Sequence, residues 1–142
     1  MFALFNFYYQ RHILALLKLT EKLSMSSKER CKAYLNSIED FNSKEKHDLV
    51  LLKGVLIHIE HKELKKVYEK IVDLSKKRVL IVEYFSRTPT ELLYHGQEGK
   101  LFKRDFAHEL IEATNVSLVA SGFSSRLMKF PQDDLDWYLF EK

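Results

Sequence analysis

The chain has 142 residues, of which 46% are hydrophobic and 30% charged; this composition suits one globular domain and excludes a disordered tail. A single cysteine, Cys31, excludes a disulfide framework and a cysteine-based zinc cluster, and four glycines with two prolines exclude collagen-like and linker-like chains. The net charge of +3 is too balanced to indicate nucleic-acid binding, so no nucleic-acid partner is expected.

Residues 1–30 predict an N-terminal helical segment. Residues 1–9 (MFALFNFYY) are apolar and aromatic, and Arg11, His12 and Lys18 interrupt the apolar runs before any approaches the roughly 20 residues that span a bilayer. Four apolar residues share one helical stripe: Ile13, Leu16, Leu17 and Leu23. An interfacial membrane helix is the alternative. Because the features of a signal peptide are also missing, we expect a cytoplasmic protein without a membrane span.

From residue 31 the pattern alternates between strands and helices. Residues 31–35 form a possible short strand, and residues 48–52 (DLVLL) suit a buried parallel strand that ends at Gly54. Residues 61–74 place apolar side chains at helical spacing, with lysine and glutamate on the opposite face. Residues 78–85 (RVLIVEYF) predict a second buried strand.

The C-terminal half completes an α/β domain over residues 31–142. A long polar loop is expected at residues 86–100, and then a helix whose apolar positions are Phe102, Phe106, Leu110 and Ala113. Residues 116–123 and 135–140 read as two closing strands joined by a turn that contains Pro131. The order predicts a mostly parallel, Rossmann-like sheet with a C-terminal antiparallel strand pair.

Two short motifs invite a chemical interpretation. His58 and His61 are three residues apart, whereas zinc-binding helices place histidines four apart, so a solvent-exposed cluster at a helix entry is favoured and no metal is expected. Residues 96–100 (GQEGK) lack the spacing of a phosphate-binding loop, but long loops are often functional lids. Several of the neighbouring side chains could bind an anionic or sugar-like ligand: Tyr94, His95, Lys100, Lys103 and Arg104.

The carboxyl ends of the expected strands give a more specific location. Ligands of doubly wound sheets bind beyond these ends, here after Leu35, Leu52 and Val82. Asn36 offers an amide to a purine edge, and Gly54 lets the backbone approach a ligand closely. Glu83 ends an apolar run, so its carboxylate needs a partner. The sequence therefore predicts one crevice shared by these strand ends.

At these residues the chain resembles the class I S-adenosylmethionine (SAM)-dependent methyltransferases, and more narrowly the pseudaminic acid biosynthesis-associated methylases. The resemblance begins at about Tyr34 and lies in several segments in order: residues 48–59 (DLVLLKGVLIHI), Glu83-Tyr84, Thr88-Pro89, residues 99–106 (GKLFKRDF), and residues 130–134 (FPQDD) with Trp137, Glu141 and Lys142. It implies SAM as cofactor and methyl transfer to a nonulosonic acid sugar or a precursor of one.

The resemblance also implies roles for individual residues. Asn36, Ser37 and Ile38 would lie near the adenine of SAM, and Lys53, Gly54 and Val55 beside its methionine portion. The acceptor side would run from Tyr84 to Arg104 and include Arg87, Tyr94 and Lys100. His58 or His95 would serve as an optional base.

The chain also departs from that family. A complete class I enzyme begins with a strand and a glycine-rich turn, yet no glycine precedes Gly54 here. Ser86-Arg87 stands where Asn-Pro is usual, and Ser124-Ser125-Arg126 where Tyr-His-Arg is common. The alternative is therefore a truncated, catalytically inactive methyltransferase-like domain. It would act as an interaction module, or as a homo-oligomer formed through the aromatic N-terminus or an open sheet edge.

Overall fold

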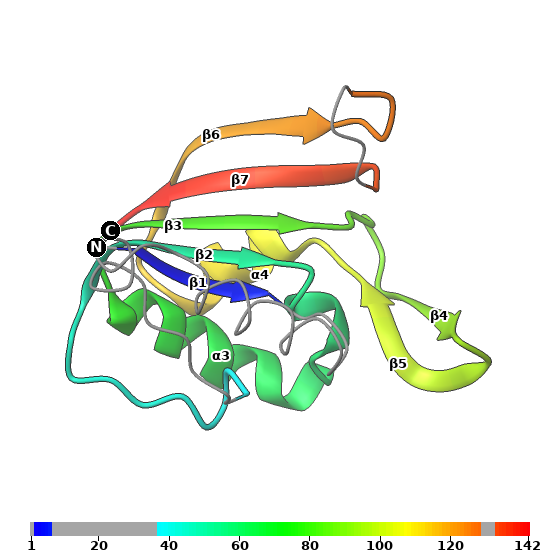
Figure 1. Cartoon of the computed structure of the whole chain (residues 1–142), viewed down its shortest axis with the longest axis horizontal. Helices are drawn as coiled ribbons and strands as arrows, with labels where there is room; N and C mark the ends of the chain where they lie inside the picture. The colour runs from blue at the N-terminus through cyan, green and yellow to red at the C-terminus, as the bar shows by residue number, and fades with distance from the viewer. Residues whose placement is uncertain (1, 7–36, 129–132) are drawn as a thin grey trace, which may run out of the picture.

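The computed structural model of the chain describes residues 2–6, 37–128 and 133–142, and its centre is a five-stranded sheet in the order β1-β2-β3-β7-β6 (Figure 1). The strands are β1 (Phe2–Asn6), β2 (His47–Lys53), β3 (Ser75–Glu83), β6 (Ser117–Ser124) and β7 (Leu135–Glu141). The expected buried strands at residues 48–52 and 78–85 and the two closing strands are thus confirmed, with small shifts at their ends.

The sheet is mixed rather than mostly parallel. β1 pairs with β2 and β2 with β3 in parallel, whereas β7 runs antiparallel to both β3 and β6. The connection from β6 to β7 spans residues 125–134, which is shorter than the crossover that a parallel pair requires. The expected C-terminal antiparallel pair is confirmed, and β7 inserts between β6 and β3.

Two helices cover one face of this sheet. Helix α3 (His61–Leu74) has the bounds expected from the sequence, and α4 (Phe106–Ala113) contacts it. Side chains of the two helices and of alternate strand positions are fully or almost fully buried together: Leu64, Ile71, Leu110, Val50, Leu52, Val79, Ile81 and Phe140. None of the helices in the described ranges is long and apolar enough to cross a membrane.

The prediction of a polar loop at residues 86–100 is wrong. Strands β4 (Thr90–Tyr94) and β5 (Gln97–Lys103) form a separate two-stranded hairpin, and Phe102 belongs to β5 rather than to a helix. His95 and Gly96 join the strands with positive φ angles of 50° and 78°. Such a two-residue turn matches the twist of the flanking strands, so Gly96 shapes a hairpin rather than a flexible loop.

The N-terminal end contains a strand where a helical segment was expected. Phe2–Asn6 forms β1 at one edge of the sheet, in parallel register with Leu49–Lys53 of β2. The helix expected around residues 13–23, the strand expected at residues 31–35 and the turn at Pro131 lie outside the described residues. The division of the chain at residue 30 stays a prediction.

Candidate functional site

The carboxyl ends of the parallel strands meet at one edge of the sheet (Figure 1). Lys53 is in register with Val82, and the Gly54 amide donates a hydrogen bond of 3.1 Å to the Val82 carbonyl oxygen. The ends after Leu52 and Val82 therefore adjoin, as the sequence predicted. The third expected end, after Leu35, lies outside the described residues.

Gly54 opens the turn that follows β2. Its φ of +63° lies in the left-handed region, which glycine adopts without the strain that a side chain adds. A Cβ placed on this glycine would meet no heavy atom of the described residues within 4 Å, so none of them fills that side of the turn. Val55 then leads into the short 3-10 helix η1 (Leu56–His58).

Glu83 fixes this turn from the end of β3. Its Oε1 accepts hydrogen bonds from the amides of Val55 at 2.8 Å and Leu56 at 2.9 Å, and the residue is only 1% exposed. Burial raises the pKa of Glu83 to about 7, against the opposing effect of the Leu56 and Val55 amides. Its other oxygen, Oε2, is buried without a hydrogen-bond partner among the described residues. The sequence predicts that this carboxylate needs a partner, and the structure shows it buried with backbone amides as its partners.

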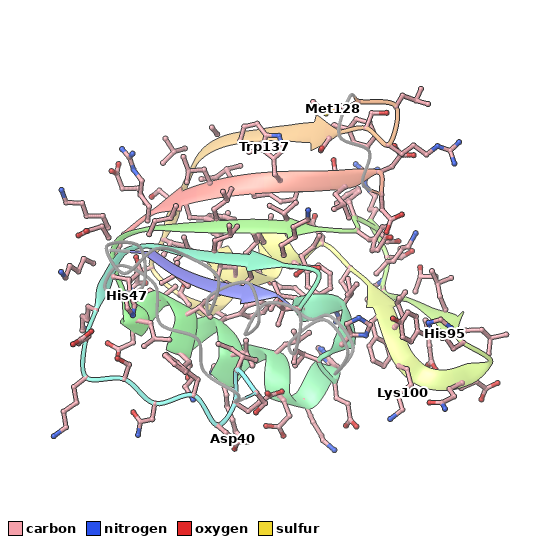
Figure 2. The ribbon with its side chains drawn as sticks, viewed as in Figure 1. Asp40, His47, His95, Lys100, Met128 and Trp137 are labelled. Carbon is pink, nitrogen blue, oxygen red and sulfur yellow. The ribbon has the colours of Figure 1, made fainter. Side chains whose placement is uncertain are left out.

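His58, Tyr94, His95 and Lys100 come together where η1 meets the β4–β5 hairpin. His58 Nδ1 lies 2.7 Å from the Lys100 carbonyl oxygen, and the Tyr94 ring contacts both His58 and His95 edge-on at centroid distances of 5.1 and 4.5 Å. Burial lowers the pKa of His58, although the hydrogen bond to Lys100 opposes this. Figure 2 shows His95 and Lys100 on the hairpin, beyond the carboxyl ends of β2 and β3.

The base of the hairpin holds the other residues expected on the acceptor side. The Tyr84 hydroxyl donates a hydrogen bond to the Asp133 carboxylate, and Lys103 Nζ lies 4.6 Å from the centre of the Tyr84 ring. Arg87 is exposed. Arg104 is buried, and its Nε lies 2.7 Å from Glu109 Oε1, so its guanidinium is held by an internal ion pair.

Of the residues expected near adenine, Ser37 and Ile38 do not lie at this edge. Asn36 lies outside the described residues. The Ser37 hydroxyl is engaged with Asp40, and Ile38 is buried in the core. Lys70 of α3 donates to the Glu39 carbonyl oxygen at 2.6 Å, and Lys70 lies roughly 14 Å along the helix axis from His61 at about 1.5 Å per residue. Ser37 and Ile38 thus lie along α3 rather than beside Gly54.

A metal site at His58 and His61 gains no support. No group of three or more metal-ligating side chains lies close enough to hold an ion among the described residues. His58 instead directs Nδ1 to the Lys100 carbonyl oxygen.

The fold is that of the SAM-dependent methyltransferases, as comparison with solved structures shows. The glycopeptide N-methyltransferase MtfA, in complex with S-adenosyl-L-homocysteine, superposes with a TM-score of 0.71 at 9% identity, over 97% of this chain and 72% of that one. Magnesium protoporphyrin IX methyltransferase from Synechocystis PCC 6803, with bound SAM, gives 0.62 at 14% identity over 98% and 58%. Burkholderia thailandensis 1,6-didemethyltoxoflavin-N1-methyltransferase gives 0.64 at 16% identity over 82% and 55%.

At these identities the likeness establishes the architecture and leaves the activity open. The chain spans a little over half of the last two enzymes. Comparison of the sequence with models of known protein families gives no match, and comparison with curated proteins gives none either. The narrower resemblance to the pseudaminic acid methylases therefore stays a prediction.

Proposed function

We propose that the protein is a SAM-dependent methyltransferase that acts on a small, sugar-type acceptor of the nonulosonic acid class. The observation that carries this proposal is the junction of β2 and β3, where an open glycine turn lies beyond adjoining parallel strand ends. Ligands of open α/β sheets bind at such an edge. Several solved methyltransferases with the same fold were crystallised with SAM or S-adenosyl-L-homocysteine.

The residues at Gly54 fit the methionine portion of SAM. No described residue fills the space beyond Gly54, and its left-handed φ turns the backbone without a side chain of its own. Lys53, Gly54 and Val55 would hold that portion of the cofactor. When bound, SAM supplies an electrophilic methyl group on a sulfonium, so the protein's main task is to orient the acceptor for in-line attack.

His58 is suited to take a proton from an acceptor hydroxyl. Its lowered pKa favours the neutral ring near pH 7. The Lys100 carbonyl can only accept, so Nδ1 carries the proton of the neutral ring and Nε2 is the basic nitrogen. His95, on the other side of Tyr94, is the second candidate base.

The acceptor side combines aromatic rings with basic side chains. Tyr94 and His58 present ring faces and edges, while Arg87 and Lys100 are exposed on the same segment. Sugars pack their apolar ring faces on aromatic side chains, and a nonulosonic acid also carries a carboxylate that guanidinium and ammonium groups bind. These features support a sugar acid over a neutral apolar acceptor.

Calorimetric titration with SAM tests the proposal. We expect binding in the micromolar range, and loss of that binding in Gly54→Val, because a β-branched side chain both strains the left-handed backbone and occupies the open space. Transfer of a labelled methyl group to a nonulosonic acid then tests the acceptor class.

Gly96→Val is the matched control. Gly96 also has a positive φ, of +78°, and a Cβ placed there would meet no heavy atom of the described residues within 4 Å. It lies in the turn of the β4–β5 hairpin and not at the β2–β3 junction. We expect this variant to lose stability without losing SAM affinity. Wild-type protein that binds no SAM at millimolar concentration would refute the proposed function.

A second candidate, an inactive interaction module, is favoured by two observations. Residues 1–53 contain no glycine, so the segment after β1 cannot provide a glycine-rich turn. The edge strand β6 exposes Leu118, Val119 and Phe123, as a surface that meets another chain would.

A further inference from the structure

Glu83 is not among the residues expected to contact SAM or the acceptor, but its side chain is hydrogen-bonded to the turn that follows Gly54. It ends β3 with a buried carboxylate, whereas the neighbouring positions of that strand face the core with Ile81 and Val79. Burying an ionisable group in apolar surroundings destabilises a fold unless its partners compensate. The groups that bind the Glu83 carboxylate therefore indicate which part of the structure its burial stabilises.

Those partners are the amides at the start of η1. Oε1 receives the N–H groups of both Val55 and Leu56, and the amides of Gly54 and Ile57 also favour the ionised form of this carboxylate. Consecutive amides at a turn and a helix start form a nest that binds an anion. Here the anion is a side chain of the adjoining strand, so the nest is filled internally and the turn is tied to β3.

We propose that Glu83 is the positioning residue of the candidate cofactor site: its carboxylate holds the Gly54–Leu56 turn in the open conformation that a ligand at the β2–β3 edge requires. The part of this inference that concerns SAM rests on the proposed function. The part that concerns the order of the turn does not.

The strength of the hydrogen bonds between Glu83 and the turn depends on whether Glu83 is protonated. A carboxylate accepts amide hydrogen bonds about twice as strongly as a neutral acid, so protonation of Glu83 weakens both bonds to the turn. The raised pKa of Glu83 places this change near pH 7. The titratable group that interacts electrostatically with Glu83 is Tyr68 on α3. Tyr68 also interacts with Arg104, which follows β5, and with Glu109 on α4, and these two residues pair with each other.

Hydrogen exchange of the Val55 and Leu56 amides, expressed as protection factors from pH 5.5 to 8.5, tests the inference without any ligand. In the wild type we expect protection to fall as the pH drops through about 7. In Glu83→Gln, which keeps the shape but not the charge, we expect protection to be about tenfold lower above pH 7 and to show no midpoint there, because hydrogen bonds to a charged partner are the stronger ones. In His58→Gln the midpoint near pH 7 should persist.

SAM affinity provides the second readout. We expect Glu83→Gln to bind SAM about tenfold more weakly at pH 8 and to lose the pH dependence of binding, while its thermal transition stays cooperative. Glu83→Asp keeps the charge but withdraws it by one methylene, so it should restore part of the pH dependence.

The two proposals fail in different ways. If the wild type binds no SAM but its turn titrates as expected, the proposed function is wrong and the role of Glu83 in ordering the turn stands. If SAM binds and Glu83→Gln matches the wild type in affinity, turn protection and pH profile, the inference about Glu83 is overturned. A wild-type turn whose protection has no midpoint between pH 6 and 8 also overturns it, and this measurement needs no variant.

Discussion

At the scale of single residues, Arg104 illustrates how a side chain expected to bind substrate is engaged inside the fold. Its Nε lies 2.7 Å from Glu109 Oε1, and the Tyr68 hydroxyl donates to Glu109 Oε2 at 2.9 Å. Burial, with the nearby Glu109 carboxylate, raises the pKa of Tyr68 well above its usual value, so the phenol stays protonated and remains a donor. These three side chains join the connection between β5 and α4 to both α4 and α3.

Replacing Arg104 with leucine should lower the free energy of unfolding by about 3 kcal/mol, because the change leaves the partly buried Glu109 carboxylate without its cation. Urea-induced unfolding at pH 7 measures this. Arg87→Leu, a basic residue of the same segment that is exposed, should change stability by less than about 0.5 kcal/mol. Equal effects of the two substitutions would show that the ion pair contributes nothing beyond an exposed one.

At the scale of elements, sequence patterns were reliable where a strand or helix is buried on one face. The bounds of helix α3 were predictable from the sequence because lysine and glutamate side chains mark its exposed face along its length. The β4–β5 hairpin is not predictable in the same way, because its strands are mostly exposed and show no apolar alternation. Its His95–Gly96 turn also lacks the Asn-Gly or Asp-Gly pair that most often marks a two-residue hairpin. The hydrogen bonds of Glu83 could not be predicted from the sequence, because its partners are the amides of Leu56 and Val55, 27 and 28 residues away.

We expect the β4–β5 hairpin to separate from η1 more readily at low pH. Burial lowers the pKa of His58, so the ring binds a proton more readily when the hairpin has separated from η1 than when it is docked. The free energy that holds the hairpin on η1 is therefore greatest above the ordinary histidine pKa, and it decreases as the pH falls below about 6.5. Protection of β4 and β5 amides should decrease between pH 7.5 and 5.5, while β3 and β7 stay protected. His58→Gln should abolish this difference, and a hairpin whose protection is independent of pH in the wild type would contradict the assignment.

At the scale of the whole molecule, the sheet ends at β6 without a further strand among the described residues, and this edge lacks the usual protection. The eight residues of β6 (SLVASGFS) include no charged side chain in a chain that is 30% charged. Leu118, Val119 and Phe123 are 45%, 50% and 60% exposed. Soluble proteins commonly protect open edges with charges or proline, and a charge-free strand can pair antiparallel with its own copy without repulsion.

We therefore expect the protein to self-associate through β6, with a dimer fraction that rises with concentration in light scattering. Phe123→Lys should weaken association at least about tenfold, because two copies of the strand would then bring like charges together. Leu93→Lys is the matched control: Leu93 is 70% exposed, but it lies on β4 in the separate hairpin, so association should be unchanged. A wild type that stays monomeric at high concentration would exclude the β6 edge as an interface, and would remove the observation that most favours an interaction module over an enzyme.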